Sequence, residues 1–278
     1  MTKRPRWSVV FTMLCIAVAF LLPAVPQPLA YHCFADQRTL FGVHNFLNVV
    51  SNFGFLILGI AGLAVVFGRR AHFEFRSERW PYAVFFLGVM LTSWGSGYYH
   101  LAPDNESLFW DRLPMTIVFM GLVSSQIVDR INIRAGLALL VPMLLLGLAS
   151  VIYWRVTERA GVGNVLPYVI MQFYSVVIVL LLAMWSPSRY TRGNDLYWVF
   201  GWYVLSKLLE MFDAQVLAVG SVVSGHTLKH MTATMAGVTV CYMLMHRTLE
   251  EPAASQKPSG NALGVTTKQD AEGVPPTR

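Results

Sequence analysis

Long apolar stretches separated by short polar loops run through most of this chain. Eight of them reach or approach the roughly 20 residues that an α-helix needs to cross a lipid bilayer. They are Trp7–Val25, Phe46–Phe67, Pro81–Leu101, Leu108–Val128, Ala135–Trp154, Val165–Trp185, Leu196–Val216 and His226–His246. The pattern predicts an all-α, polytopic membrane helix bundle. We expect a seven-transmembrane core in residues 31–247, preceded by an N-terminal apolar helix in residues 1–30.

The two ends of the chain differ from this core. The first apolar stretch follows the basic start Met1–Arg6 and resembles a signal peptide, but Val25–Ala30 lacks a clean small-x-small cleavage pattern. We therefore expect a signal-anchor-like helix that is retained. Beyond Arg247 the apolar runs stop and Pro, Gly, Ser and Lys become frequent, which predicts a disordered tail over residues 248–278.

Composition supports a membrane protein and excludes several other classes. Only 13% of the 278 residues are charged and 55% are hydrophobic, whereas soluble domains carry about 25% charged residues. The net charge of +6 does not indicate nucleic-acid binding, because Lys and Arg lie mostly in short loops and at the chain ends. The 3 cysteines are too scattered for a disulfide framework or a thiolate metal site.

The distribution of Lys and Arg predicts the orientation in the membrane. Arginines concentrate in alternate loops, namely Gly68–Trp80, Asp129–Arg134 and Ser186–Asn194. The loops between them are acidic (Ala102–Ser107) or uncharged (Leu217–Gly225); the loop with Arg155 and Arg159 is the exception. Because basic loops remain in the cytoplasm, we expect these three loops and both chain ends to be cytoplasmic.

Five polar residues stand out against the apolar background. Ser96 and His100 are four residues apart, as are His226 and His230, so each pair shares one face of a helix. Asp111 follows His100 by eleven residues, near the start of the next apolar stretch. The predicted topology places all five at one depth, in the non-cytoplasmic half of the membrane. Ionisable residues at membrane depth are costly and usually mark a functional site.

These residue types suit metal-dependent hydrolysis. Three histidines can hold a zinc ion, leave a fourth position for water and lower the pKa of that water toward about 7. Asp111 is then the natural proton acceptor, and Ser96 can donate a hydrogen bond to a developing oxyanion. The simpler alternatives are interfacial histidines and a serine that bonds to its own helix. The last pair, HxxxH, lacks the glutamate of HExxH, which argues against an ordinary metallopeptidase.

The same residues resemble a known family. The S-x-x-x-H motif ending at His100, Asp111 within WDRLPM, the final HxxxH and the stretch NFLNVVSN (45–52) are similar to the alkaline ceramidases. These belong to a wider group of seven-helix membrane hydrolases that includes the progestin and adipoQ receptors. The resemblance covers about residues 34–246. It implies zinc on His100, His226 and His230, with Ser96 and Asp111 in the active site.

The resemblance also raises the question of calcium. Eukaryotic members bind calcium through several carboxylates just before the helix that begins near Asn45. The matching stretch here, Cys33–Asn45, contains Asp36 as its single carboxylate. Because calcium takes six to eight oxygen ligands, Asp36 and Asn45 are what remains of a degenerate calcium site.

Two further sets of polar residues interrupt apolar stretches. Lys207, Glu210 and Asp213 fall at i, i+3 and i+6, and Asn48 and Asn52 are four residues apart. Pairing between helices is the default role of such groups. The alternative is that they support the zinc ligands from behind.

The resemblance implies a membrane-embedded zinc amidohydrolase that cleaves the amide bond of ceramide or another N-acyl lipid to a fatty acid and a sphingoid base. Its partners would be this substrate and membrane lipids, and no nucleic acid. We expect the zinc site to face the non-cytoplasmic leaflet of a bacterial inner membrane or a eukaryotic endomembrane. One alternative is a lipid-responsive receptor or non-catalytic zinc protein on the same scaffold. Another is a haem protein with two axial histidines.

Overall fold

The apolar stretches fold as helices. The structure, a computed structural model, describes residues 6–250, and within that range it contains helices and no strand. The predicted all-α fold is thus confirmed, whereas residues 251–278 of the predicted tail lie outside the described part. The α-helices are α1 (Arg6–Leu21), α2 (Phe46–Val50), α3 (Phe53–Phe67), α4 (Arg79–Leu101), α5 (Asn105–Arg130), α6 (Ile133–Arg159), α7 (Leu166–Trp185), α8 (Asp195–Met211), α9 (Asp213–Gly220) and α10 (Gly225–His246); two short 3-10 helices, η1 (Leu29–His32) and η2 (Arg76–Glu78), join them.

Three of these helical spans carry clear membrane character. They are Phe46–Phe67 (α2 together with α3), Ile133–Arg159 and Leu166–Trp185, each long and apolar enough to cross a bilayer. Large apolar side chains also cover the outside of the bundle. Leu145 and Leu146 on α6 are each 62% exposed, and Ile57 on α3 is 68% exposed. Exposed apolar faces of this extent are typical of lipid contact.

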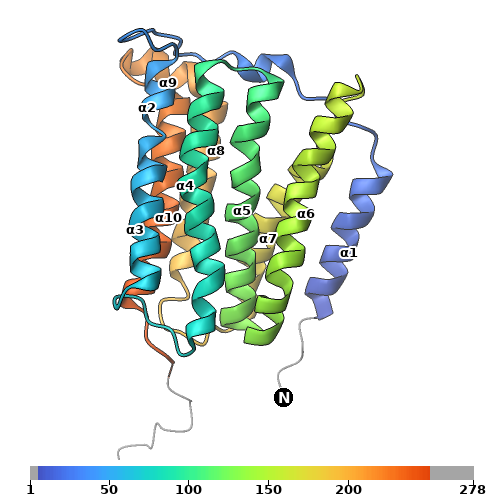
Figure 1. The fold of residues 1–278 in the computed structure, drawn as a ribbon, viewed down its shortest axis with the longest axis vertical. Helices are drawn as coiled ribbons and strands as arrows, with labels where there is room; N and C mark the ends of the chain where they lie inside the picture. The colour runs from blue at the N-terminus through green and yellow to red at the C-terminus, as the bar shows by residue number, and fades with distance from the viewer. Residues whose placement is uncertain (1–5, 251–278) are drawn as a thin grey trace, which may run out of the picture.

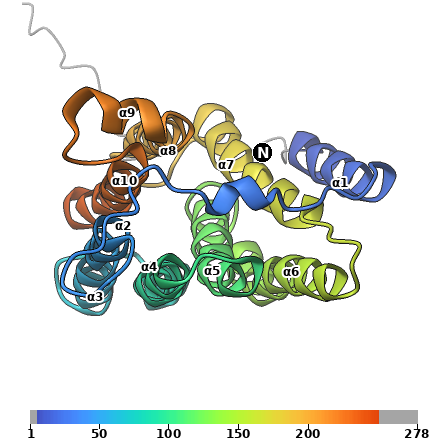
Figure 2. The same cartoon turned by 90° about the horizontal axis from the view of Figure 1, so that it is seen from above.

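The helices form two layers (Figures 1 and 2). One layer contains α3, α4, α5 and α6, and the other contains α10, α8, α7 and α1. Helix α1 lies at the edge, where Trp7 and Phe11 pack on Trp185 and Tyr174 of α7. The segment from α1 to α2, which includes η1, crosses one end of the bundle together with α9. We call this end the η1 end, and the opposite end, with η2, the η2 end.

Two predicted continuous helices are broken at the η1 end. The stretch Phe46–Phe67 is interrupted at Ser51 and Asn52, whose side chains donate to the backbone carbonyl of Asn48 over 3.1 and 2.7 Å. Such local bonds compete with the regular helix. The stretch Leu196–Val216 is interrupted at Phe212, where α8 ends and α9 turns across the bundle.

A buried ion pair joins the helices at the η2 end. The guanidinium of Arg247, just past α10, donates to Asp129 of α5 over 2.7 Å, and both residues are almost fully buried. The hydroxyl of Tyr82 on α4 donates to the same carboxylate over 2.7 Å. A buried charge needs a partner of this kind, so this contact fixes the ends of three helices.

A close approach of α4 and α5 lies beside two of the predicted active-site residues. A Cβ atom on Gly95 would stand 2.0 Å from the backbone oxygen of Trp110, so only glycine allows the two helices to come this near. Ser96 follows Gly95 on α4, and Asp111 follows Trp110 on α5. The glycine therefore sets the separation of Ser96 and Asp111.

This contact can be tested with a matched pair of variants. Gly95→Ala should separate α4 from α5 and destabilise the protein by about 1–3 kcal/mol, the usual cost of overpacking. Gly97→Ala is the control, because a Cβ there meets nothing within 4 Å. Thermal unfolding of the purified protein in detergent measures both. Equal melting temperatures for the two variants would show that the helices yield without cost.

Candidate metal centre

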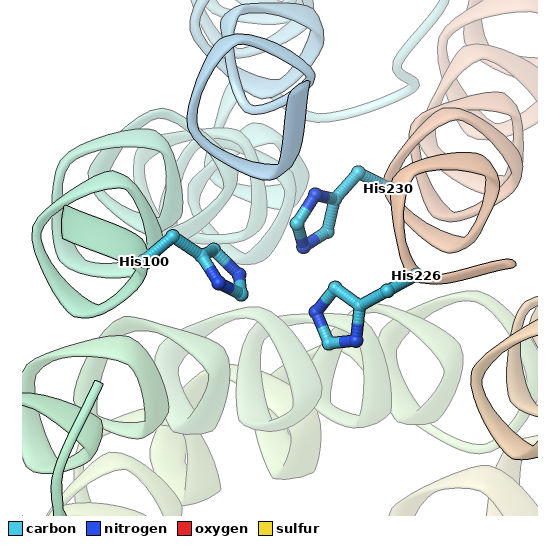
Figure 3. A group of neighbouring side chains, drawn as sticks. All are labelled: His100, His226 and His230. Atoms are coloured by element: carbon cyan, nitrogen blue, oxygen red, sulfur yellow. The ribbon is translucent and has the colours of Figure 1, made fainter. Parts of the chain in front are cut away.

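Three histidines from two helices meet at the η1 end. His100 lies in the last turn of α4, and His226 and His230 lie in the first turns of α10. Each contributes one ring nitrogen to a group whose atoms all lie within 4.8 Å of one another, and the rings point toward a common centre (Figure 3). Their exposures are 1%, 4% and 2%. The predicted ligands thus form one buried group that could bind a metal ion.

Ser51 fixes the ring of His230. The Ser51 hydroxyl lies 2.7 Å from Nδ1 of His230 and donates its own hydrogen to the carbonyl of Asn48. It therefore accepts from an Nδ1–H, which leaves a lone pair on Nε2 of His230. That Nε2 is buried and has no hydrogen-bond partner among the described residues. A histidine held this way through its other nitrogen is the usual arrangement of a metal ligand.

His100 presents a second nitrogen of the same kind. Its Nδ1 is buried and has no hydrogen-bond partner within the described range. The backbone carbonyl of His100 accepts from the amide of Asn45 over 2.9 Å, and Asn45 itself has a left-handed backbone with φ 51°. Buried polar atoms normally have partners. Two such nitrogens beside a third imidazole therefore fit a metal ion.

Asp213 positions the beginning of α10 and thereby His226. One oxygen of its carboxylate accepts from the backbone N–H of His226 over 2.7 Å, and the other accepts from that of Ala35 over 2.9 Å. The neighbouring Gly225 packs so closely on α8 that a Cβ would stand 2.1 Å from the carbonyl oxygen of Leu209. Asp213 thus supports the backbone of the centre, from the turn into α9 rather than from a stripe along α8.

Phe34 covers the centre on the side of the η1 end. Its ring centroid lies 4.7 Å from that of His100 and 4.6 Å from that of His226, and its side chain is buried. An apolar cover lowers the local dielectric and excludes water from one side of the ligands. Sequence reasoning missed Phe34, because a single phenylalanine in a loop carries no recognisable pattern.

Asn48 and Asn52, predicted either to pair helices or to support the ligands, bond near the centre but to other groups. Asn48 accepts from the hydroxyl of Thr227 over 2.8 Å, which ties α2 to α10 next to His226. Asn52, in the break between α2 and α3, donates to the backbone carbonyl of Asn48 on α2. The imidazole of His230 contacts Ser51 instead. The first interpretation, pairing of helices, describes Asn48 well.

Asp36 does not present a free carboxylate. Arg38 donates to its two oxygens over 2.8 and 2.7 Å. These hydrogen bonds hold the pKa of the Asp36 carboxyl below its ordinary value. Asn45, the other residue of the degenerate calcium site, uses its amide on the carbonyl of His100. The side chains of Asp36 and Asn45 thus both bond within the protein.

An apolar cavity of about 170 Å³ opens next to the histidines. Ser96, Asp111 and His230 line one part of it, and the side chain of Ser96 faces the carboxyl group of Asp111. The rest of the wall is largely apolar and includes Phe55, Phe85, Val89, Phe119, Val179 and Val199. The predicted serine and aspartate therefore share one cavity with a predicted ligand.

Two lysines and a glutamate form a further group at this wall, which we call the Lys–Glu cluster (Lys207, Glu210 and Lys229). The ammonium groups of Lys207 and Lys229 each lie 2.7 Å from one oxygen of Glu210. The Nζ of Lys229 is also 3.4 Å from Nε2 of His226. Sequence reasoning missed Lys229, although a lysine between two ligands on an apolar helix is a detectable signal.

Comparison of the chain with models of known protein families and with curated proteins finds no match. The chemistry of the centre therefore follows from its own residues. It combines three neutral nitrogen donors, a carboxylate and a hydroxyl with an apolar cavity. This set suits the binding of a divalent transition metal beside an apolar ligand.

Metal content tests the centre directly. The purified protein should contain about one divalent metal ion per chain, and His226→Ala should lose it, because two imidazoles rarely suffice. His246→Ala is the matched control on the same helix, since His246 is exposed and bonds to the carbonyl of Tyr242. Metal analysis after dialysis provides the measurement. Full retention of metal in His226→Ala would contradict the assignment of His226 as a metal ligand.

Proposed function

We propose that the protein is a seven-transmembrane, zinc-dependent amidohydrolase that cleaves the amide bond of ceramide or a related N-acyl lipid, similar to the alkaline ceramidases. One observation carries the proposal. Three buried histidines converge beside an apolar cavity that also contains a serine and an aspartate, two side chains that can stabilise the oxyanion and transfer the proton in amide hydrolysis. A lipid-responsive receptor on the same scaffold would bind the lipid without turnover, so an assay for hydrolysis separates the two functions.

The arrangement of the helices supports the membrane part of the proposal. Helices α3–α8 and α10 would form the seven spans, with α1 as an additional helix at the edge. The basic loops, Gly68–Trp80, Asp129–Arg134 and Ser186–Asn194, lie at the η2 end, whereas the histidines lie at the η1 end. The positive-inside rule then directs the η2 end to the cytoplasm and the centre to the opposite leaflet.

Zinc is the metal that best suits this donor set. Three imidazoles with neutral ring nitrogens are a common ligand set for catalytic zinc. A haem would require the porphyrin plane between two axial histidines. The ring centroids are only 4.9, 5.0 and 5.1 Å apart, which leaves no slot for such a plane. When bound, zinc would supply a Lewis acid that makes water nucleophilic near neutral pH.

The chain's own residues would carry the proton and stabilise the charge. Asp111 accepts a proton from the attacking water and delivers it to the leaving nitrogen as the C–N bond breaks. The oxygen of the water remains on the acyl carbon, so the products are a fatty acid and an amine. Ser96 donates a hydrogen bond to the acyl oxygen, where negative charge develops. The apolar wall of the cavity holds the acyl chain.

The role of Asp111 can be separated from metal binding. Asp111→Asn should keep the metal, because Asp111 is not one of the grouped ligands. The rate of amide hydrolysis should fall by at least roughly 10²-fold, the typical contribution of general acid–base catalysis. Release of fatty acid from a short-chain ceramide, measured with metal content on the same sample, tests this. Asp195→Asn at the η2 end is the control, and a normal rate for Asp111→Asn would make that residue structural.

The orientation can be tested with a cysteine that the chain already contains. Cys33 at the η1 end is exposed, whereas Cys15 is partly buried and Cys241 is buried. An impermeant maleimide added to intact cells should therefore label Cys33. Arg70→Cys, in the exposed loop at the η2 end, should stay unlabelled in a Cys33→Ser background until the membrane is permeabilised. The reverse pattern would overturn the orientation and leave the metal centre intact.

A further inference from the structure

Three cationic side chains, Lys207, Lys229 and Arg112, lie around two carboxylates, Glu210 and Asp111, at one side of the cavity. Lys207 and Lys229 both line it, together with Asp111 and His230. The two ammonium groups share the single carboxylate of Glu210. The side chains of Lys229 and Glu210 are 17% and 15% exposed and that of Lys207 is 34% exposed, so water screens the Lys229–Glu210 pair more weakly than the Lys207–Glu210 pair. Asp111 is the second carboxylate beside the lysines and Arg112 is the third cation, so one positive charge remains to attract a further anion.

The neighbouring charges do not remove this excess. Asp111 lies next to Arg112, whose buried guanidinium donates to the side chain of Gln27 over 2.6 Å and stacks on aromatic rings. No carboxylate bonds to Arg112 in the described part of the chain. The carboxylate of Asp213 is taken up by two backbone N–H groups. The bound ion would add further positive charge to this end of the cavity.

Lys229 stands where the amine side of a substrate would lie. It precedes the ligand His230 by one residue, and its Nζ lies 3.4 Å from the ring of His226. An acyl chain would lie along the apolar part of the wall, formed by residues such as Phe85, Phe119 and Val179. A carboxylate one carbon away from the scissile nitrogen would therefore come close to Lys229 once the amide carbonyl reaches the centre.

We infer that the preferred substrates are N-acyl amino acids, and that Lys229, with Lys207, binds their head-group carboxylate. This inference rests on the proposed amide hydrolysis and names its substrate class. Glu210 holds the two ammonium groups in place and leaves them donors to spare, because each lysine has three N–H donors. A neutral head group would gain less, since hydrogen bonds between charged partners are about twice as strong as neutral ones.

A matched pair of substrates tests this. N-palmitoylglycine and N-palmitoylethanolamine share the acyl chain and the amide, and differ in a carboxylate against a hydroxymethyl group. The ratio of their kcat/KM values should favour the glycine conjugate by roughly tenfold or more, the worth of one charge-assisted hydrogen bond. Lys229→Met should bring this ratio close to one, and Lys229→Arg should restore part of it. Arg70→Met, which removes one positive charge at the η2 end, should keep the ratio.

Binding separates a failure of this inference from a failure of the proposed function. Zinc-loaded Asp111→Asn protein should bind N-palmitoylglycine more tightly than N-palmitoylethanolamine, and the added Lys229→Met change should abolish the difference. If the wild-type protein hydrolyses neither these amides nor a short-chain ceramide, the proposed function fails and this binding preference alone decides the inference. If it hydrolyses the ceramide but neither amide, the inference alone fails. If Lys229→Met does not fold, Lys207→Met replaces it in both assays and should at least halve the preference.

Two results would overturn the inference and leave amide hydrolysis standing. One is equal rates and equal binding for the two amides in the wild-type protein. The other is a preference for the glycine conjugate that survives Lys229→Met while inhibition by palmitate disappears. That second result would assign the lysines to the carboxylate of the fatty acid product instead of the head group.

Discussion

A buried imidazole nitrogen must find a partner, and this constraint governs the η1 end of the molecule. His100 and His230 each bury a ring nitrogen that no described protein group satisfies. The free-energy cost of burying an unpaired nitrogen is tolerated where a ligand such as a metal ion can bind to it. The polar groups around these rings bond to the ligands or to the helix ends that carry them. Ser51 bonds to the ring of His230, Asn45 to the backbone at the end of α4, and Asp213 to the backbone at the start of α10.

The two ends of the bundle deal with buried charge in different ways. At the η2 end, Arg247 and Asp129 pair one to one, with Tyr82 on the same carboxylate, so the charges balance. At the η1 end, the carboxylate of Glu210 accepts from both Lys207 and Lys229, and the carboxyl group of Asp111 lines the cavity. The Arg247–Asp129 pair leaves no charge over, whereas Lys207, Lys229 and Arg112 outnumber Glu210 and Asp111 by one positive charge. The contrast marks the η1 end as the candidate ligand-binding end independently of the histidine motifs.

The parts of the site that depend on local periodicity could be predicted from the sequence. The pairs Ser96/His100 and His226/His230 share helix faces because a four-residue spacing does so in any helix. The breaks at Ser51 and Phe212 were missed, although Ser51 and Asn52 bond locally to the carbonyl of Asn48. Adjacent polar residues at Ser51 and Asn52 were the available signal. No sequence signal predicted that Phe34 packs against the histidines, because this contact arises from a loop that crosses the bundle.

The position of the three histidines also has a mechanical consequence. His100 belongs to the layer with α3 and α5, whereas His226 and His230 belong to the layer with α8 and α7. An ion shared among them would cross-link segments more than a hundred residues apart in the chain, and through Ser51 it would also reach the break between α2 and α3. Metal binding would then hold the two layers together beside the cavity. The free energy of metal binding would become part of the free energy of folding.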